Sequence, residues 1–333
     1  MKTILKSDIF ALMSRIYRNA GLDDREAIEG IYHHLLQNEM SGKHSHGFIR
    51  MAMNISAMRQ YGVPSGRPSL AVDSGALAIV DGQNHIGLVA GRYAVDVAIQ
   101  KAADHGIAFV GTRHYIGTTG TMNYYNRLFV DAGLVGVAGC NSIAHVCHPD
   151  GVDPVIGTNP ISFGLPSKET PCVIDVTTAQ WAYGKLLDLH QAGRPMPHDA
   201  IIDKNGDPST CFEDIMKGYA MLPMNGFKGF GLGLAVEILS GALIGAKCGA
   251  QVVEGFDGMF FIALDPDRLV GRTVFEDHVE TLLQSIKTSR QAVVDKEILI
   301  PGERSYRMYK DNCSKDTVDL SDAVYNEMKA LDS

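Results

Sequence analysis

Hydrophobic residues recur at helical spacing over the first sixty residues of the chain. The segment that starts at Asp24 places Ala27, Ile31 and Leu35 three or four residues apart, which favours one buried face of a helix. Segments that follow Ser7 and Ser45 show the same spacing, and a serine or aspartate at each start can cap the helix. The pattern predicts that three amphipathic helices open the chain.

From about residue 76 the pattern changes to short apolar runs separated by helical segments. The runs are ALAIV, IAFV, LVGVAG, CVIDV and, later, MFFIAL. This alternation indicates a sheet flanked by helices, and a length of 333 residues suits about two domains. We expect an α/β chain with a helical part over 1–75, joined by C-terminal helices over 270–333, and a central α/β part over 76–269.

Composition and charge exclude several classes of function. The chain has 30 basic and 38 acidic side chains and no basic block, so nucleic acid is a poor partner. The start, MKTILKSDIF, lacks the apolar core of a signal peptide, and the longest apolar segment contains Glu237 and is short for a bilayer. The six cysteines lack paired spacing, which favours reduced thiols. We expect a cytoplasmic protein that binds neither nucleic acid nor membrane.

The glycine-rich stretch GFKGFGLGLAVEIL raises the question of a dinucleotide site. A Rossmann turn needs an apolar strand before its G-x-G-x-x-G pattern, whereas KGYAMLPMN precedes this stretch and its glycines follow G-x-G-x-G spacing. Glycines inside a helix more often permit close packing of a neighbour. A nicotinamide cofactor would therefore need another architecture. Lys228 lies near this helix start, where it suits either a phosphate or the solvent.

The stretch HSHGFIR carries a histidine and an arginine four residues apart. On a helix, His46 and Arg50 would share one face. Histidine exchanges protons near neutral pH, and the arginine fork matches a carboxylate, which together suit a 2-hydroxy or 2-oxo acid. Taken alone, a histidine and an arginine one turn apart are more often surface residues.

Two histidine clusters raise a metal site as an alternative. His44 and His46 have H-x-H spacing, and HVCHPD brings together His145, Cys147 and His148. The chain has no HExxH or CxxC motif that would complete a ligand set, so a polar turn is the simpler interpretation. We expect no resident metal.

Polar residues follow the predicted strands. Asn141 and Ser142 come after LVGVAGC, and Asp175 and Thr177 lie at the end of CVIDV. Ligands of open α/β sheets collect beyond the carboxyl ends of strands, so these residues are candidates for one cleft, although each also suits a helix cap.

In order along the chain, SHGFIR, NS, GTNPISF, VIDVTTAQWAYGK, DKNGDP, GFKGFGL and PGE resemble motifs of the malate/L-lactate dehydrogenase family, which is distinct from the Rossmann-fold lactate and malate dehydrogenases. The resemblance implies a non-Rossmann NAD(P)-binding fold with a discontinuous helical domain and a central α/β domain. It also implies a homodimer that binds NAD or NADP and a small-molecule substrate.

The resemblance also implies roles for individual residues. His46 matches the residue that exchanges the proton, with Arg50 beside it and His114 as a second catalytic candidate. The implied substrate contacts are Ser45, Arg50 and Thr158. The implied cofactor contacts are Ser142, Asp175, Val176, Thr177, Phe227, Lys228, Gly302, Glu303 and Arg304.

Two positions depart from the family pattern. His44 stands where members often carry aspartate, and ureidoglycolate dehydrogenases are similar to this chain at that position. In RHYIG, His114 is one residue out of step with the second family histidine, and the following glycine would put Tyr115 in its place.

We expect hydride transfer between NAD(P) and C2 of a small acid of the malate, lactate, sulfolactate or ureidoglycolate type. The alternatives are a reductase of cyclic 2-imino acids and a cofactor-binding or metal-binding protein without turnover.

Overall fold

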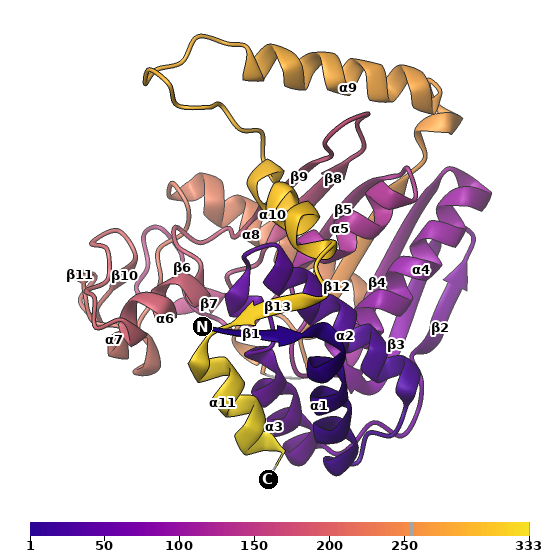
Figure 1. The fold of residues 1–333 in the computed structure, drawn as a ribbon. Helices are drawn as coiled ribbons and strands as arrows, with labels where there is room; N and C mark the ends of the chain where they lie inside the picture. Colours follow the sequence, from indigo (N-terminus) through magenta and orange to yellow (C-terminus); the bar gives the residue numbers. More distant parts are fainter. Residues whose placement is uncertain (254–255, 333) are drawn as a thin grey trace.

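The computed structural model describes residues 1–253 and 256–332 and is built around a mixed sheet of seven strands (Figure 1). In spatial order these are β2 (Ser69–Ser74), β3 (Leu77–Ile86), β4 (Ile107–Ile116), β12 (Met259–Leu264), β5 (Val135–Cys140), β8 (Ile161–Leu165) and β9 (Cys172–Val176). β3 and β4 run parallel, and the other neighbouring pairs of this sheet are antiparallel. The predicted α/β class is confirmed.

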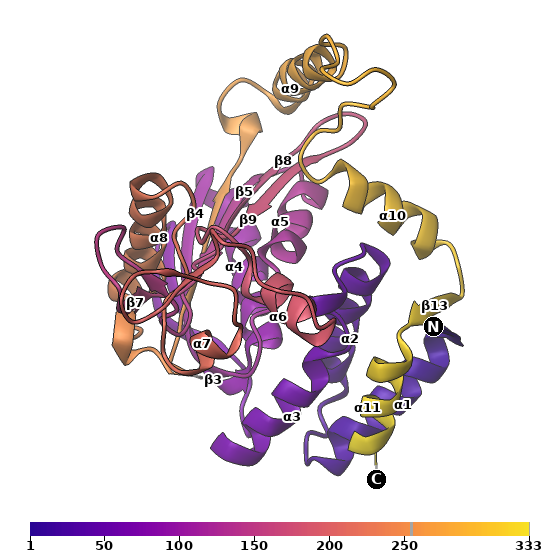
Figure 2. The ribbon, with the colours of Figure 1, turned by 90° about the vertical axis from the view of Figure 1, so that its left-hand side faces the viewer.

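Helices cover both faces of the sheet. α4 (Gly87–His105) and α5 (Met122–Asp131) pack on one face, and α8 (Phe227–Ser240) packs on the other (Figure 2). Consecutive strand residues point to opposite faces, so Phe261 joins the core under α4 and α5 while Phe260 packs with Val236 of α8. Gly229, Gly231 and Gly233 of GFKGFGLGLAVEIL thus lie within a helix, as predicted, and Gly226 directly precedes it.

Both ends of the chain form one helical layer. α1 (Lys6–Asn19), α2 (Arg25–Met40) and α3 (Arg50–Tyr61) pack with α11 (Asp322–Leu331), and β1 (Lys2–Leu5) pairs antiparallel with β13 (Thr317–Leu320). Their shared core includes Ile31, Leu320 and Met328 and continues to Leu88 at the start of α4. This layer therefore rests against the sheet domain beside α4.

The stretch from Gln180 to Met224 contains several short elements. α6 (Tyr183–Gln191), the β10–β11 hairpin (Ile201–Ile202 and Pro208–Ser209) and α7 (Glu213–Met216) pack with β6 (Val146–Cys147) and β7 (Pro154–Ile156). Short 3-10 helices cover His44–His46, Ala242–Ile244, Gly249–Gln251 and Pro266–Arg268. α9 (Arg272–Lys287) stands away from the body, and α10 (Glu303–Cys313) returns to it (Figure 1).

Candidate active site

One edge of the central sheet collects the loops that carry most of the predicted site residues. The pairings Ile86 with Ile116, Met259 with Cys140, and Ile161 with Val176 show that these strand ends lie at the same edge. We call it the loop edge. It brings together the segments 117–121, 141–142, 157–160 and 175–177, which are far apart in the sequence.

The turn that carries His46 differs from the predicted helix. His44–His46 form a 3-10 helix, and α3 begins only at Arg50, so His46 and Arg50 do not share a face of one α-helix. Gly47, with φ −87° and ψ −145°, interrupts the helical path between them. They are close for another reason, because the Arg50 guanidinium turns back and donates Nε–H to the carbonyl oxygen of Ser45 at 2.7 Å.

His46 is held in a single orientation by polar neighbours. Its carbonyl oxygen accepts a hydrogen bond from Asn38 Nδ2 at 3.0 Å, and its ring Nδ1 lies 3.1 Å from Ser45 Oγ. Burial lowers the pKa of His46 to about 3, and the positive charges of Arg50 and Lys43 add to the effect. The imidazole is therefore neutral at pH 7 and able to accept a proton.

Arg50 presents part of its guanidinium to the same space. Nη1 contacts Met53 Sδ at 3.8 Å, and Nη2 has no hydrogen-bond partner among the residues that the structure describes. Burial lowers the pKa of Arg50, and the nearby Tyr183 and Asp188 partly offset that effect. A partly buried cation with a free N–H group is suited to bind a carboxylate.

Three residues around this pair are not among the sequence predictions. Lys43 Nζ forms an ion pair with Asp175 Oδ2 at 2.7 Å, which links the helical layer to β9. Tyr183 and Asp188 of α6 face the charge of Arg50. The motif VIDVTTAQWAYGK contains Tyr183, but no local pattern shows that α6 folds over a turn more than 130 residues earlier in the chain.

The loops beyond β5, β8 and β9 are tied to one another. Thr177 Oγ1 donates to the carbonyl oxygen of Thr158 at 2.8 Å, and Gly157 lies so close to Ser142 that a side chain there would overlap the serine hydroxyl. The predicted contacts Ser142, Thr158, Asp175, Val176 and Thr177 therefore lie on adjoining loops of one edge.

A buried carboxylate fixes these loops from behind. Glu237 of α8 is 3% exposed and accepts hydrogen bonds from Asn141 Nδ2 at 2.8 Å and Asn159 Nδ2 at 2.6 Å. It also accepts one from the Gly249 amide at 2.9 Å. The glutamate that argued against a membrane segment thus ties the loop after β5 to the loop before β8.

Comparison with known proteins identifies the family to which the chain belongs. The model of the malate/L-lactate dehydrogenase family matches residues 5–329. The chain belongs to this family. It is 32% identical over 302 residues to L-sulfolactate dehydrogenase of Methanocaldococcus jannaschii, with 88% of this chain and 86% of that protein covered. It is 29% identical over 318 residues to malate dehydrogenase of Pyrococcus horikoshii, with 90% and 87% covered.

A solved structure supports the same conclusion. Sulfolactate dehydrogenase from M. jannaschii superposes with a TM-score of 0.89 at 29% identity, over 99% of this chain and 96% of that one. The protein is thus a 2-hydroxy acid dehydrogenase that uses a nicotinamide cofactor, and its helical layer and mixed sheet are those of the family.

The two candidates for a second catalytic position, His114 and Tyr115, are neighbours whose side chains point in different directions. His114 has φ +57°, its side chain is half exposed, and its Nδ1 lies 2.9 Å from Asp81 Oδ2. Tyr115 is fully buried and donates its hydroxyl to Asp257 Oδ2 at 3.0 Å beside the loop edge. The positive φ of His114, opposite a register shift in β3, breaks the alternation of β4, so Tyr115 joins the core with Ala108 and Val110 while the His114 side chain faces outward.

The start of α8 fits the diphosphate of a dinucleotide. Gly226 precedes the helix with φ +63°, no side chain caps the helix, and Phe227 and Lys228 are exposed. The first N–H groups of a helix lack internal partners and attract anions, and Lys228 adds a positive charge. The residues predicted from the family motif are thus chemically suited to the cofactor of this dehydrogenase.

The segment Gly302, Glu303 and Arg304 opens α10 beside β9. Gly302 has φ +83° and packs so closely on Val173 that a Cβ atom there would lie 2.6 Å from the Val173 carbonyl oxygen. Glu303 is 2% exposed, and its carboxylate binds Lys287, Arg307 and the Ile300 amide. Arg304 is exposed. The Glu303 side chain therefore holds the segment in place, whereas Arg304 is open to a ligand.

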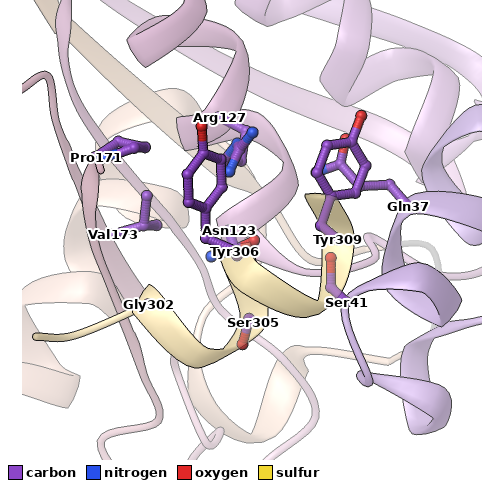
Figure 3. A pocket seen from close by; sticks show the side chains of 10 residues that line it. All are labelled: Gln37, Ser41, Asn123, Arg127, Pro171, Val173, Gly302, Ser305, Tyr306 and Tyr309. Atoms are coloured by element: carbon purple, nitrogen blue, oxygen red, sulfur yellow. The ribbon is translucent and has the colours of Figure 1, made fainter. Parts of the chain in front are cut away.

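A small cavity lies behind this segment (Figure 3). Arg127 of α5 stacks on the ring of Tyr306 at 4.5 Å and on that of Tyr309 at 5.2 Å, which attaches α10 to the sheet domain. With a volume of about 10 Å³, the cavity has room for a water molecule but not for a cofactor.

The two histidine clusters have other partners than a metal. No group of three or more potential metal ligands occurs among the described residues. His44 Nδ1 binds Glu39 Oε2 at 2.5 Å, and His145 stacks on Tyr183 with ring centres 5.1 Å apart. His148 packs edge-on against Phe227 and Phe230. The polar cluster HVCHPD thus lies beside both α6 and the start of α8.

Proposed function

We propose that His46 moves the proton and Arg50 holds the substrate carboxylate while hydride passes between the nicotinamide and C2 of a small 2-hydroxy or 2-oxo acid. The observation that carries this proposal is a partly buried, neutral imidazole beside a partly buried guanidinium with a free N–H group. When bound, NAD or NADP supplies the hydride acceptor or donor.

The chain's own residues account for the proton and the carboxylate. In oxidation, neutral His46 accepts the proton of the C2 hydroxyl as C2 loses hydride, and in reduction it returns that proton to the carbonyl oxygen. Ser45 Oγ, next to Nδ1, leaves Nε2 as the nitrogen that faces the substrate. A bound carboxylate would partly neutralise Arg50 and Lys43, which raises the pKa of His46 and favours proton uptake.

The cofactor is proposed to lie along the loop edge, against Ser142, Asp175, Val176 and Thr177, with its diphosphate at Phe227 and Lys228. The far end of the cofactor would lie against Gly302, Glu303 and Arg304. The substrate would lie against Thr158 and Ser45. Arg304 tests the choice between NAD and NADP. A rise of the KM for NADPH alone in Arg304→Ala identifies a 2′-phosphate contact, whereas equal KM changes with both cofactors exclude one.

The substrate class is tested with purified enzyme. Oxidation of NADH and NADPH is followed with a panel of 2-oxo acids and one cyclic 2-imino acid, and reduction of NAD and NADP with malate, lactate, sulfolactate and ureidoglycolate. Turnover of a hydroxy or oxo acid supports the proposal and names the substrate. Turnover of the imino acid alone would replace it, and binding of NADH without any turnover would contradict the substrate class.

The second catalytic position is tested by a matched pair of variants. His114→Asn keeps a polar side chain beside Asp81, and Tyr115→Phe removes only the hydroxyl that binds Asp257. Loss of kcat in His114→Asn alone supports the histidine expected from the family motif. Loss in Tyr115→Phe alone assigns the position to the tyrosine.

We further propose that the enzyme is a soluble cytoplasmic homodimer that uses α8 as an interface. Among the described residues, one helical stretch, Phe227–Ile244, is long and apolar enough to cross a membrane by length and composition. Phe227, Leu234 and Ile238 form a stripe on it and are 60%, 42% and 50% exposed. The opposite side packs on the sheet and carries the hydrogen-bonded Glu237, so a second copy of the chain is the proposed cover of the stripe.

A further inference from the structure

The last turn of α2 holds the catalytic turn at several points. Glu39 Oε1 accepts the Phe48 amide N–H at 3.0 Å, and Glu39 Oε2 binds His44 Nδ1 at 2.5 Å. His44 and Phe48 lie on either side of His46 in the sequence. One carboxylate therefore fixes the turn before and after the proton-transferring residue.

Asn38, the neighbour of Glu39, adds a contact at the centre of the turn. Its Nδ2 donates to the His46 carbonyl oxygen at 3.0 Å, and its Oδ1 accepts from Thr121 Oγ1 at 2.9 Å. Thr121 belongs to the segment that follows β4. Asn38 thus attaches the turn both to α2 and to the loop edge.

Gly47 gives Glu39 the space that it needs. A Cβ atom on Gly47 would overlap the Glu39 carboxylate, so the glycine of the S-H-G motif is required by this contact. Gly47 also has a negative φ, −87°, which other residues can adopt. Close approach, and not backbone conformation, therefore explains the glycine here.

The charge on Glu39 is matched by His44. The Glu39 side chain is 2% exposed, and within the described residues its ion-pair partner is His44, whose side chain is 60% exposed. The hydrogen bond to Glu39 raises the pKa of His44, although partial burial opposes the shift. A buried carboxylate without these donors would be costly, which keeps the contact formed.

We propose that Glu39, paired with His44, is a positioning residue that fixes the His44–Phe48 turn and thereby aims the His46 imidazole at the substrate oxygen. The inference rests on the role proposed above for His46. Glu39 acts through the turn and does not touch substrate or cofactor.

Three variants test this role. Glu39→Ala removes both contacts, Glu39→Gln keeps an acceptor for the Phe48 amide, and Glu29→Gln is the control because Glu29 lies on the same helix and pairs with Arg25 at the surface. Displacing a catalytic group by about 1 Å costs on the order of 10²-fold in rate. We expect Glu39→Ala to lower kcat by about that factor, Glu39→Gln to lose less, and Glu29→Gln to match the wild type. The KM for the cofactor should stay within about twofold, because the cofactor lies on the sheet side.

A second readout does not depend on turnover. The ring signals of His46, assigned by their absence in His46→Asn, are followed by NMR as the pH is lowered. In the wild type the imidazole should stay neutral at pH 5, whereas in Glu39→Ala its measured pKa should rise towards about 6.5 as the turn becomes exposed. Glu39→Gln replaces the alanine variant in both measurements if the latter does not fold.

The outcomes separate the two proposals. Folded Glu39 variants with wild-type kcat and an unchanged His46 titration would overturn the positioning role, as would a loss that raises the cofactor KM by the same factor. If the wild type turns over none of the hydroxy, oxo and imino acids, the proposed function fails, and the His46 titration alone decides the role of Glu39.

Discussion

At the scale of single residues, the proposed site depends on a neutral histidine and an available arginine that lie, partly buried, next to each other. Burial disfavours the charged form of both side chains, and the two residues respond to it differently. His46 loses its proton, while Arg50 keeps its charge with help from Tyr183 and Asp188. The pair is therefore suited to bind an anion while the His46 imidazole stays neutral.

His46→Ala should lower kcat by about 10²–10⁴-fold, the usual contribution of a general acid or base. The variant should remain folded, because the hydrogen bonds of this turn use the backbone of His46 more than its ring. Steady-state kinetics measure the loss, and a thermal melt checks the fold. An unchanged kcat would remove His46 from the mechanism.

The pKa of His46 also predicts a loss of stability in acid. Its value is about 3 in the folded protein and about 6.5 in an unfolded chain, so the unfolded state binds more protons between these values. Stability should therefore fall as the pH drops from 6.5 towards 3, and this group alone contributes a loss of ~2 kcal/mol by pH 5. Urea denaturation at pH 7.5 and pH 5 measures the change.

The control for this prediction is His46→Asn, which cannot take up the proton. Its stability should decrease less between the two pH values than that of the wild type. Equal decreases would show that His46 does not carry the effect, and buried His34, whose pKa burial also lowers, would then be the next group to replace.

At the scale of elements, the local hydrophobic pattern predicted the positions of helices and strands better than the positions at which the chain turns between them. The runs ALAIV, IAFV, LVGVAG, CVIDV and MFFIAL all belong to strands of the central sheet. β8, in contrast, follows GTNP and has the sequence ISFGL. Its short length and Gly164 obscure the two-residue alternation that identifies a strand. The interruption at Gly47 was missed for a similar reason, because its cause, Glu39, lies outside the turn.

Glycines in two helices should respond oppositely to alanine. Gly233 of α8 faces Thr178, whose Oγ1 would lie 2.7 Å from a new Cβ atom, whereas Gly30 of α2 has nothing within 4 Å of that position. Gly30→Ala should stabilise the protein by about 0.5–1 kcal/mol through helix propensity. Gly233→Ala should destabilise it by about 1–3 kcal/mol through overpacking. Thermal melts of both variants check the signs, and a stable Gly233→Ala would contradict the close packing of α8.

The site could be predicted only in part from sequence. His46, Arg50 and the strand-end residues Ser142, Asp175 and Thr177 are visible in motifs and in the rule that ligands collect at strand ends. Glu39 is not, because its contacts with His44 and Phe48 depend on how the chain turns back after α2. Lys43 and Asp188 are not, because their relevance comes from packing of the His46 turn against β9 and α6. Electrostatic partners brought together across more than a hundred residues leave no local signal.

At the scale of the whole molecule, the exposed stripe on α8 predicts an association. Ile238→Lys places a charge at the C-terminal end of this stripe, while Ile238 itself is not part of the predicted cofactor site. We expect the wild type to have the mass of a dimer by light scattering, and Ile238→Lys to shift it towards the monomer. Lys204→Glu, a charge change in the distant β10–β11 turn, should leave the mass unchanged. A monomeric wild type would contradict the interface.

The pairing of the two chain ends has a consequence for how the enzyme is made. The Met1 amino group lies 3.0 Å from the Asp322 carboxylate, and β1 needs β13 as its partner. At a synthesis rate of roughly 5–20 residues per second, β13 is made tens of seconds after β1. The helices on either side of the His44–Phe48 turn are translated first, but their hydrophobic core is complete only after the last segments have been made. A ribosome-bound chain that stops short of residue 317 should therefore hold a finished sheet and an idle active site.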